Sequence, residues 1–216
     1  MPRPKLYRDP IHGQIRYQRV MAPPFSAGSG SRTVDADLSY LITRLIDSAE
    51  FQRLRHIRQN GLVNLVFHGA EHSRFGHSMG TCTLSQVMYE RIARNMSESI
   101  EPRRYISTVA AALLHDVGHG PFSHVFEEIL SACGVPFHHE VMTCRMMLEP
   151  DSPLHRALAE VDSALPGEIS LYIDRQRRVE SKAQDHFSYR LVSSQIDADR
   201  LDYLQRDAYY AGLEGH

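Results

Sequence analysis

The sequence predicts an all-α protein, because apolar residues recur at helical spacing along most of its 216 residues. Runs of helix-forming alanine and leucine end at glycines, and prolines stand where further helices would begin. The alternation of apolar and polar residues that is typical of strands is confined to short stretches. A chain of this length can form one sizeable core, so we expect one domain over residues 1–216.

The composition is ordinary for a soluble globular protein, with 42% hydrophobic and 23% charged residues. A net charge of -2 favours neither nucleic acid nor a membrane as a partner. Three cysteines without CxxC spacing indicate a reducing compartment, and no secretory signal is evident, so we expect a cytoplasmic protein. The 13 histidines are unusual and favour metal or proton chemistry.

The N-terminal third predicts a hairpin, a loop and two helices. Residues 5–20 alternate after a proline, which predicts a short hairpin around residues 9–13. Residues 22–37 are rich in Pro, Gly and Ser and predict a mobile loop. A helix should begin near residue 38. A second helix over residues 49–59 should turn its arginines to the solvent and end in a left-handed Asn-Gly cap.

The rest of the chain is predicted to be mainly helical. The apolar segment 62–67 fits either a strand or a buried irregular segment. Helices are expected over residues 75–94, 102–114, 121–132, 138–147 and 189–210. Residues 150–187 are more polar and are interrupted by Pro and Gly. They predict an insertion with one or two short helices and minor strands within residues 165–180.

The segment HDVGHGPFSH, residues 115–124, places three histidines and an aspartate directly after an aliphatic helix. Burying the adjacent His115 and Asp116 at a helix end is unfavourable unless a partner satisfies them. A metal ion does so, because it binds imidazole nitrogen and carboxylate oxygen together. The alternative is a hydrogen-bonded His-Asp pair that caps a turn, which needs no metal.

Two further residues complete a candidate metal site. His77 stands at a helix start and Asp199 on a late acidic helix, so with the His-Asp pair they offer two imidazoles and two carboxylates. Such a shell leaves coordination positions for water and substrate. It suits Fe, Mn, Zn, Co or Ni better than metals that prefer thiolates. On the late helix, Asp199, Tyr203 and Asp207 follow at steps of four and share one face.

Five motifs in this order resemble the HD-domain metal-dependent phosphohydrolases, most closely the deoxynucleoside triphosphate (dNTP) triphosphohydrolases that join an HD domain to a sterile alpha motif. These motifs lie at residues 9–13, 51–55, 72–78, 115–124 and 197–207. The resemblance covers nearly the whole chain except residues 22–37 and 150–187. It implies an all-α HD-domain fold with a metal site between helices. It also implies hydrolysis of a nucleotide phosphoester, with dNTP cleavage to deoxynucleoside and triphosphate as the favoured reaction.

The resemblance assigns roles position by position. The implied metal ligands are His77, His115, Asp116 and Asp199. The implied catalytic residues are His124 as general acid, Glu127, His119 and His139. The implied substrate contacts are Arg74 and Arg200 to phosphate, Tyr203 and Asp207 to a sugar without a 2′-hydroxyl, and Gln59 to the 3′-hydroxyl. Magnesium carried in with the nucleotide, a regulatory nucleotide and a homo-oligomer are implied as well.

Several of these residues also have purely structural interpretations. His119 and His124 can hydrogen-bond to the backbone, and His139 can simply begin a helix. Arg74 can lie on the surface, as most arginines do, and Tyr203 can be core packing. The histidines outside the implied set, among them His12 in the predicted hairpin, are assigned no role.

The sequence departs from the family at three places. Arg200 stands where related enzymes have a lysine, and Asn60 where they have a leucine near the base, so base or sugar selectivity can differ. The chain ends at His216, before a helical region of the family, so we expect a truncated form or a minimal core. A nucleoside monophosphate phosphatase, a cyclic-nucleotide phosphodiesterase and a non-catalytic nucleotide sensor are the alternative functions.

Overall fold

A computed structural model of the protein describes residues 4–17 and 34–213. Within these residues the chain forms eleven α-helices, two short 3-10 helices and one two-stranded sheet, which confirms the predicted all-α fold. The elements are β1 (Lys5–Asp9), β2 (Gly13–Tyr17), α1 (Val34–Ile46), α2 (Ala49–Gln52), η1 (Arg53–His56), η2 (Val63–Leu65), α3 (Arg74–Asn95), α4 (Pro102–Leu114), α5 (His124–Ala132), α6 (His139–Leu148), α7 (Pro153–Ala159), α8 (Leu165–Ile173), α9 (Arg175–Glu180), α10 (Phe187–Val192) and α11 (Ala198–Ala211).

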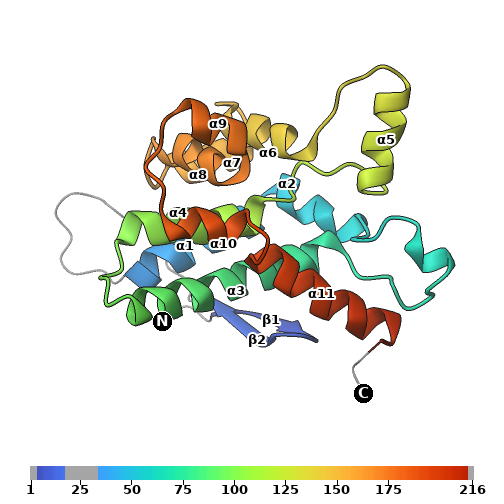
Figure 1. The fold of residues 1–216 in the computed structure, drawn as a ribbon, viewed down its shortest axis with the longest axis horizontal. Helices are drawn as coiled ribbons and strands as arrows, with labels where there is room; N and C mark the ends of the chain where they lie inside the picture. Colours follow the sequence, from blue (N-terminus) through green and yellow to red (C-terminus); the bar gives the residue numbers. More distant parts are fainter. Residues whose placement is uncertain (1–3, 18–33, 214–216) are drawn as a thin grey trace.

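Helix α4 is the centre of the fold. Its last ten residues, from Tyr105 to Leu114, are all buried, and it contacts α1, α3, α8 and α10. The helix begins at Pro102, and the Glu101 side chain accepts hydrogen bonds from the next two backbone N–H groups, of Arg103 and Arg104. In Figure 1, α4 crosses the molecule between α3 and the β1–β2 hairpin below and α6–α9 above. The buried helix therefore ends, with its His-Asp pair, inside the protein.

The N-terminal hairpin is confirmed. Strands β1 and β2 are antiparallel, with Lys5 paired to Tyr17 and Asp9 paired to Gly13. The Asp9 carboxylate closes the turn by accepting hydrogen bonds from the backbone N–H groups of Ile11 and His12, at 2.9 and 3.0 Å. This arrangement presents the His12 side chain toward α11.

Several predicted segments differ in the structure. The predicted loop 22–37 is helical from Val34 onward, and residues 22–33 lie outside the described residues. The strands predicted within residues 165–180 are wrong, because this region forms α8 and α9. Within α8, Ile169, Tyr172 and Ile173 are buried on one helical face, and this packing outweighs the local Pro-Gly signal.

The predicted helix 189–210 is in fact two helices, α10 and α11. Between them Asp197 takes an extended conformation and caps α11, accepting a hydrogen bond from the Arg200 N–H at 2.9 Å. The break puts Asp199 in the first turn of α11. Residues 62–67 are neither a strand nor buried: they form the exposed 3-10 turn η2 and its flanks.

Helices α3 and α11 approach closely at a glycine. A Cβ added at Gly80 would lie 1.9 Å from Asp202 Oδ1 and 2.5 Å from an Arg206 nitrogen. The Asp202 carboxylate therefore lies directly against the α3 backbone. Any side chain larger than glycine at position 80 would occupy the space of this carboxylate.

We predict that Gly80→Ala destabilises the protein by about 3 kcal/mol or more, the upper range for overpacked cores, because hydrogen bonds on every side fix the carboxylate it meets. Urea denaturation measures this change. Gly167→Ala in α8 is the matched control, since its added Cβ meets nothing, and it should stabilise by up to about 1 kcal/mol. Equal effects of the two substitutions would contradict the packing described here.

Among the described residues, none of the helices combines the length and apolar character needed to cross a membrane. The cytoplasmic location and the single-domain organisation stay predictions.

Candidate active site

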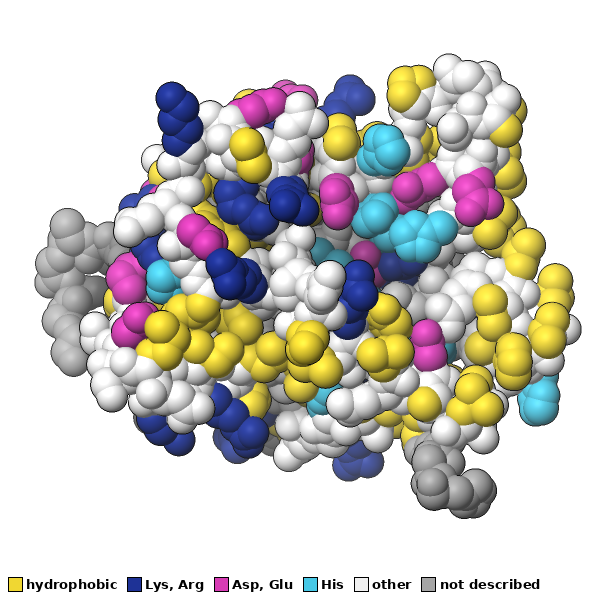
Figure 2. Space-filling model, in the orientation of Figure 1, with side chains coloured by type: hydrophobic (Ala, Val, Ile, Leu, Met, Phe, Trp, Pro, Cys, Tyr) yellow, Lys and Arg dark blue, Asp and Glu magenta, His cyan; other side chains and the backbone are white. Residues whose placement is uncertain are grey.

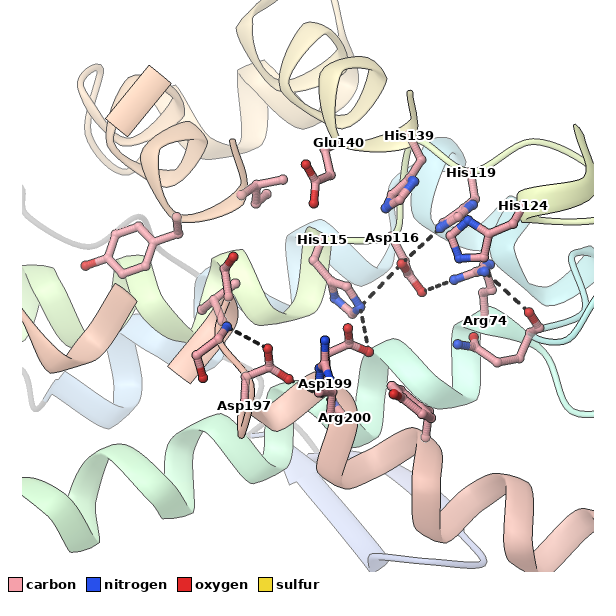
Figure 3. A pocket seen from close by; sticks show the side chains of 17 residues that line it. Arg74, His115, Asp116, His119, His124, His139, Glu140, Asp197, Asp199 and Arg200 are labelled. Carbon is pink, nitrogen blue, oxygen red and sulfur yellow. Dashed lines mark hydrogen bonds and ion pairs between the residues drawn. The ribbon is translucent and has the colours of Figure 1, made fainter. Parts of the chain in front are cut away.

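Four side chains from three helices converge on one point. The His77 Nε2 atom lies 2.9 Å from Asp199 Oδ1, 3.3 Å from His115 Nε2 and 3.6 Å from Asp116 Oδ2. The His115 Nε2 atom lies 3.4 Å from Asp116 Oδ1 and 3.7 Å from Asp199 Oδ1. Ligands bound tetrahedrally at about 2.1 Å lie about 3.4 Å apart, so His77, His115 and Asp116 have the spacing of a metal shell, with Asp199 Oδ1 beside the two histidines. Figure 3 shows His115, Asp116 and Asp199 pointing toward one another.

Local structure fixes how these side chains point. Ser73 caps α3 by accepting a hydrogen bond from the Gly76 N–H, which sets His77 in the first turn. The His77 Nδ1 atom is hydrogen-bonded to Asp202 at 2.7 Å. The His115 Nδ1 atom donates to the carbonyl oxygen of Ala112 at 2.8 Å. Both rings therefore present Nε2 to the shared point, as ligating histidines do.

The electrostatics of this group follow from burial and pairing. Burial alone would lower the pKa of His115, but the Asp116 and Asp199 carboxylates raise it to about 9. Burial would raise the pKa of Asp199, but His115 and His77 hold it below its usual range. A metal ion binds neutral imidazole, so binding at this group is coupled to proton release.

The turn after α4 is held from two sides. Thr143 on α6 accepts a hydrogen bond from the Gly118 N–H at 2.9 Å and donates to the carbonyl of His115 at 3.1 Å. Arg53 donates to the carbonyls of His119, at 2.8 Å, and Val117. The arginines of residues 49–59 are predicted to face the solvent. This prediction is wrong for Arg53, which is half-buried and supports the turn that carries His115 and Asp116.

A second group surrounds Glu127 on α5. The His139 Nδ1 atom lies 2.6 Å from Glu127 Oε1, and the Nδ1 atoms of His119 and His124 lie 3.7 and 3.8 Å from the same oxygen. The rings of His119 and His139 stack at 3.8 Å. His119 Nε2 is 3.3 Å from Asp116, which joins the two groups. The four predicted catalytic residues thus lie together beside the metal-ligand group.

The members of this second group differ in environment. Burial lowers the pKa of His119 to about 4, against the effect of Asp116, so its ring is neutral near pH 7. Burial would raise the pKa of Glu127, but the hydrogen bond with His139 lowers it. The side chain of His124 is 66% exposed and reaches the solvent from the first residue of α5. His124 is therefore the group best placed to exchange a proton with a bound molecule.

Arg74 is buried, so its interpretation as a surface arginine is wrong. Its guanidinium donates to Asp116 Oδ2 at 2.5 Å, to Ser123 Oγ at 2.8 Å and to the carbonyl of Gln59 at 3.3 Å. Ser123 has a φ of 57°, in the left-handed region, and its hydroxyl also donates to the carbonyl of Arg58 at 2.8 Å. The strained residue before α5 therefore orients Arg74.

Replacing Ser123 with alanine should lower the free energy of unfolding by about 1–3 kcal/mol, because it leaves a buried guanidinium N–H and a carbonyl without their partner. Thermal denaturation measures the loss. Ser131→Ala on the exposed side of α5 is the control and should stay within about 0.5 kcal/mol of the parent. A Ser123→Ala protein as stable as this control would show that the hydroxyl does not hold Arg74.

Three of the four residues of each group line one cavity of about 320 Å³, and His77 and Glu127 stand outside its lining. Figure 2 shows histidine side chains around this hollow, between the helices at the top and α11. The lining includes predicted ligands and substrate contacts together: Gln59, Arg74, His115, Asp116, His119, His124, His139, Asp199, Arg200 and Tyr203. Asp207 is not part of the lining; it accepts a hydrogen bond from Asn60 at 2.8 Å.

Comparison with known proteins identifies the domain. The family model described as HD domain matches residues 74–165, from the start of α3 to the start of α8. The chain contains an HD domain. The match includes three of the four converging residues and stops before the fourth, on α11.

The matches to relatives and to a solved structure extend beyond residues 74–165 of this chain. The protein YwfO of Bacillus subtilis is 39% identical, over 98% of this chain and 42% of that protein. A deoxynucleoside triphosphate triphosphohydrolase SAMHD1 homolog of Dictyostelium discoideum is 38% identical, over 79% and 34%. Human SAMHD1 is 32% identical, over 98% and 34%. A phosphohydrolase from Bacteroides thetaiotaomicron matches with a TM-score of 0.69 and 30% identity, over 98% of this chain and 43% of that one.

These matches confirm the resemblance to HD-domain phosphohydrolases that the five motifs indicate. The chain spans 34–42% of the length of the three named relatives.

The structure also places near the site several residues that the sequence did not point to. Glu140 and Asp197 line the cavity, and Asp202 contacts His77 from behind. His12, assigned no role from sequence, lies 2.6 Å from Asp202. A spacing of four between Asp202 and Arg206 was a signal for a buried ion pair, but no local pattern connects either residue to a hairpin some 190 positions earlier.

Proposed function

We propose that the chain is a metal-dependent phosphohydrolase that acts on nucleotides, with dNTP hydrolysis to deoxynucleoside and triphosphate as its reaction. The observation that carries this proposal is that Arg74 and three residues of each group line one cavity, with His77 directly behind the ligands. The named SAMHD1 relatives and the phosphohydrolase structure support it.

The proposed metal ligands are His77, His115, Asp116 and Asp199. The donor set is two imidazole nitrogens and two carboxylates, which suits Fe, Mn, Zn, Co or Ni. When bound there, a divalent ion supplies charge neutralisation and lowers the pKa of water. The ligands come from α3, the end of α4 and α11, so the packing of these three helices sets their separation.

The proposed proton donor to the leaving 5′-oxygen is His124. Its exposed ring lines the cavity from the start of α5, and the Nδ1 atoms of His124 and His139 lie 3.8 and 2.6 Å from the same Glu127 oxygen. His119, neutral and stacked on His139, holds the group together and contacts Asp116.

The proposed substrate contacts lie on the other walls. Arg74 and Arg200 line the cavity and provide cationic donors for phosphate oxygens. Gln59 and Tyr203 also line it and are proposed to contact the sugar. The predicted role of Asp207 rests on the resemblance alone. Magnesium carried with the nucleotide, a regulatory nucleotide and a homo-oligomeric state likewise stay predictions.

A nucleoside monophosphate phosphatase is the second candidate function. The cavity volume of about 320 Å³ favours it, because this lies at the lower end of the range of roughly 300–1,000 Å³ for small-molecule sites. The two candidates share the metal group and differ in which phosphate bond is presented to it.

Product analysis separates the candidates. Purified protein with Mn²⁺ is given each dNTP, each NTP and dAMP, and inorganic triphosphate and phosphate are resolved by ion-exchange chromatography. Triphosphate from dNTPs but not from NTPs is the expected result. Phosphate from dAMP alone would replace the proposal with the phosphatase, and no product from any substrate by protein with bound metal would contradict both.

A further inference from the structure

The Asp202 carboxylate takes part in four hydrogen bonds with three side chains, although Asp202 is not part of the cavity lining. It lies on α11 one turn after Asp199, and its side chain is completely buried. One oxygen accepts from His77 Nδ1 at 2.7 Å, and the other is 2.6 Å from His12 Nε2. Arg206 donates to both oxygens at 2.9 Å.

The same network reaches the N-terminal hairpin by two routes. His12 stands in the hairpin turn and bonds directly to Asp202. Arg206, which is almost fully buried, also donates to both oxygens of Asp9, at 2.9 and 3.2 Å. Asp9 in turn closes the hairpin turn through its bonds to the backbone of residues 11 and 12. The hairpin turn is thus connected through Asp202 to the Nδ1 atom of His77.

A network that only fastened the hairpin to α11 would need Arg206 and Asp9 but not His77. The structure instead gives one Asp202 oxygen to His77 and the other to His12, and Gly80 leaves the space in α3 for this carboxylate. A carboxylate that accepts from Nδ1 of an imidazole fixes the tautomer and the ring plane, and makes Nε2 a stronger ligand. The bond from His12 fixes the orientation of that carboxylate.

We propose that Asp202 is the positioning residue for the metal ligand His77, and that His12 orients Asp202, so the N-terminal hairpin forms part of the metal site. This inference rests on the proposed metal site. Its consequence is that the hairpin turn and the metal ion are energetically coupled: changing the turn weakens metal binding, although the turn contacts neither the metal ligands' Nε2 atoms nor the cavity.

The experiment measures the dissociation constant and stoichiometry of Mn²⁺ from the electron paramagnetic resonance signal of the free ion. The proteins compared are the parent, Asp202→Asn, His12→Ala, His12→Gln, Lys5→Ala and His115→Ala. Glutamine at position 12 keeps an N–H donor near the place of the imidazole Nε2. Lys5→Ala removes the ion pair of the hairpin with Asp47 and leaves the Asp202 network intact, which makes it the matched control. Circular dichroism of the metal-free proteins checks the fold.

We expect Asp202→Asn to weaken Mn²⁺ binding about 10- to 100-fold, the range for partners of metal-ligating histidines. His12→Ala should weaken it by about threefold or more, since it acts through Asp202. His12→Gln should restore most of the affinity, and Lys5→Ala should bind as the parent does. If Asp202→Asn does not fold, the two His12 variants still decide, because His12 stands in the hairpin turn and not in the helical core.

The other outcomes separate this inference from the proposed function. Parent affinity in both Asp202→Asn and His12→Ala, with binding lost in His115→Ala, would overturn the inference and leave the metal site standing. Weaker Mn²⁺ binding in Asp202→Asn but not in His12→Ala would overturn the proposed role of the hairpin. An equal loss of Mn²⁺ affinity in Lys5→Ala and His12→Ala would show a general effect of loosening the hairpin. It would also overturn the proposed role of His12. A parent protein that binds no Mn²⁺ would overturn the metal site and the inference together.

Discussion

The Asp116→Asn protein should fold, lose the proposed metal ion and lose the proposed phosphohydrolase activity by about a thousandfold or more, because such an ion contributes several kcal/mol to transition-state stabilisation. The Asp116 carboxylate is within 3.6 Å of both His77 and His115, and it also accepts from Arg74. Asparagine keeps the shape but not the charge. Metal content after dialysis and the rate of product release measure both losses.

A matched control for this variant is Asp151→Asn, at an exposed aspartate between α6 and α7. It changes the net charge equally and should leave metal content and rate unchanged. Full activity in Asp116→Asn would contradict the proposed centre. A metal-free Asp116→Asn protein that still released product at the parent rate would place the chemistry elsewhere.

The His124→Ala protein should lose about 10²- to 10⁴-fold in kcat, the range for removing a general acid, while its metal content and KM stay close to those of the parent. This split follows from geometry, because His124 lines the cavity but stands outside the four-ligand group. Steady-state kinetics with the substrate that the product analysis identifies measures the change.

The control for this prediction is His68→Ala, which removes another exposed histidine outside the cavity lining. It should leave kcat and KM unchanged. Parent kcat in His124→Ala would transfer the proton donor to another residue of the cavity. Loss of metal in this variant would show that the histidine group holds the ion.

The sequence predicted α3 and α4 well, because each begins at a recognisable cap and the aliphatic run of α4 is strongly helix-forming. The predictions failed where packing between distant segments decides. Nothing local to residues 165–180 shows that their apolar residues cover α4, and the local Pro-Gly signal alone favours a break with short strands. The single helix expected over residues 189–210 is broken because Asp197 caps α11 instead of continuing a helix.

The candidate site shows the same division. The sequence placed His77, His115, Asp116 and Asp199 in one group by their chemistry and by resemblance, and the structure brings them together. The roles of Arg53 and Asp202 could not be predicted, because each acts on a segment far away in the chain. An arginine that binds the HD turn has the same local pattern as one on a solvated helix face.

The most direct test of the account is anomalous X-ray scattering from crystals of the Mn²⁺-loaded protein, measured on both sides of the manganese absorption edge. The account predicts a peak about 2.0–2.2 Å from His77 Nε2, His115 Nε2 and the carboxylates of Asp116 and Asp199. A peak only among His119, His124, Glu127 and His139, or no peak at either group, would contradict it.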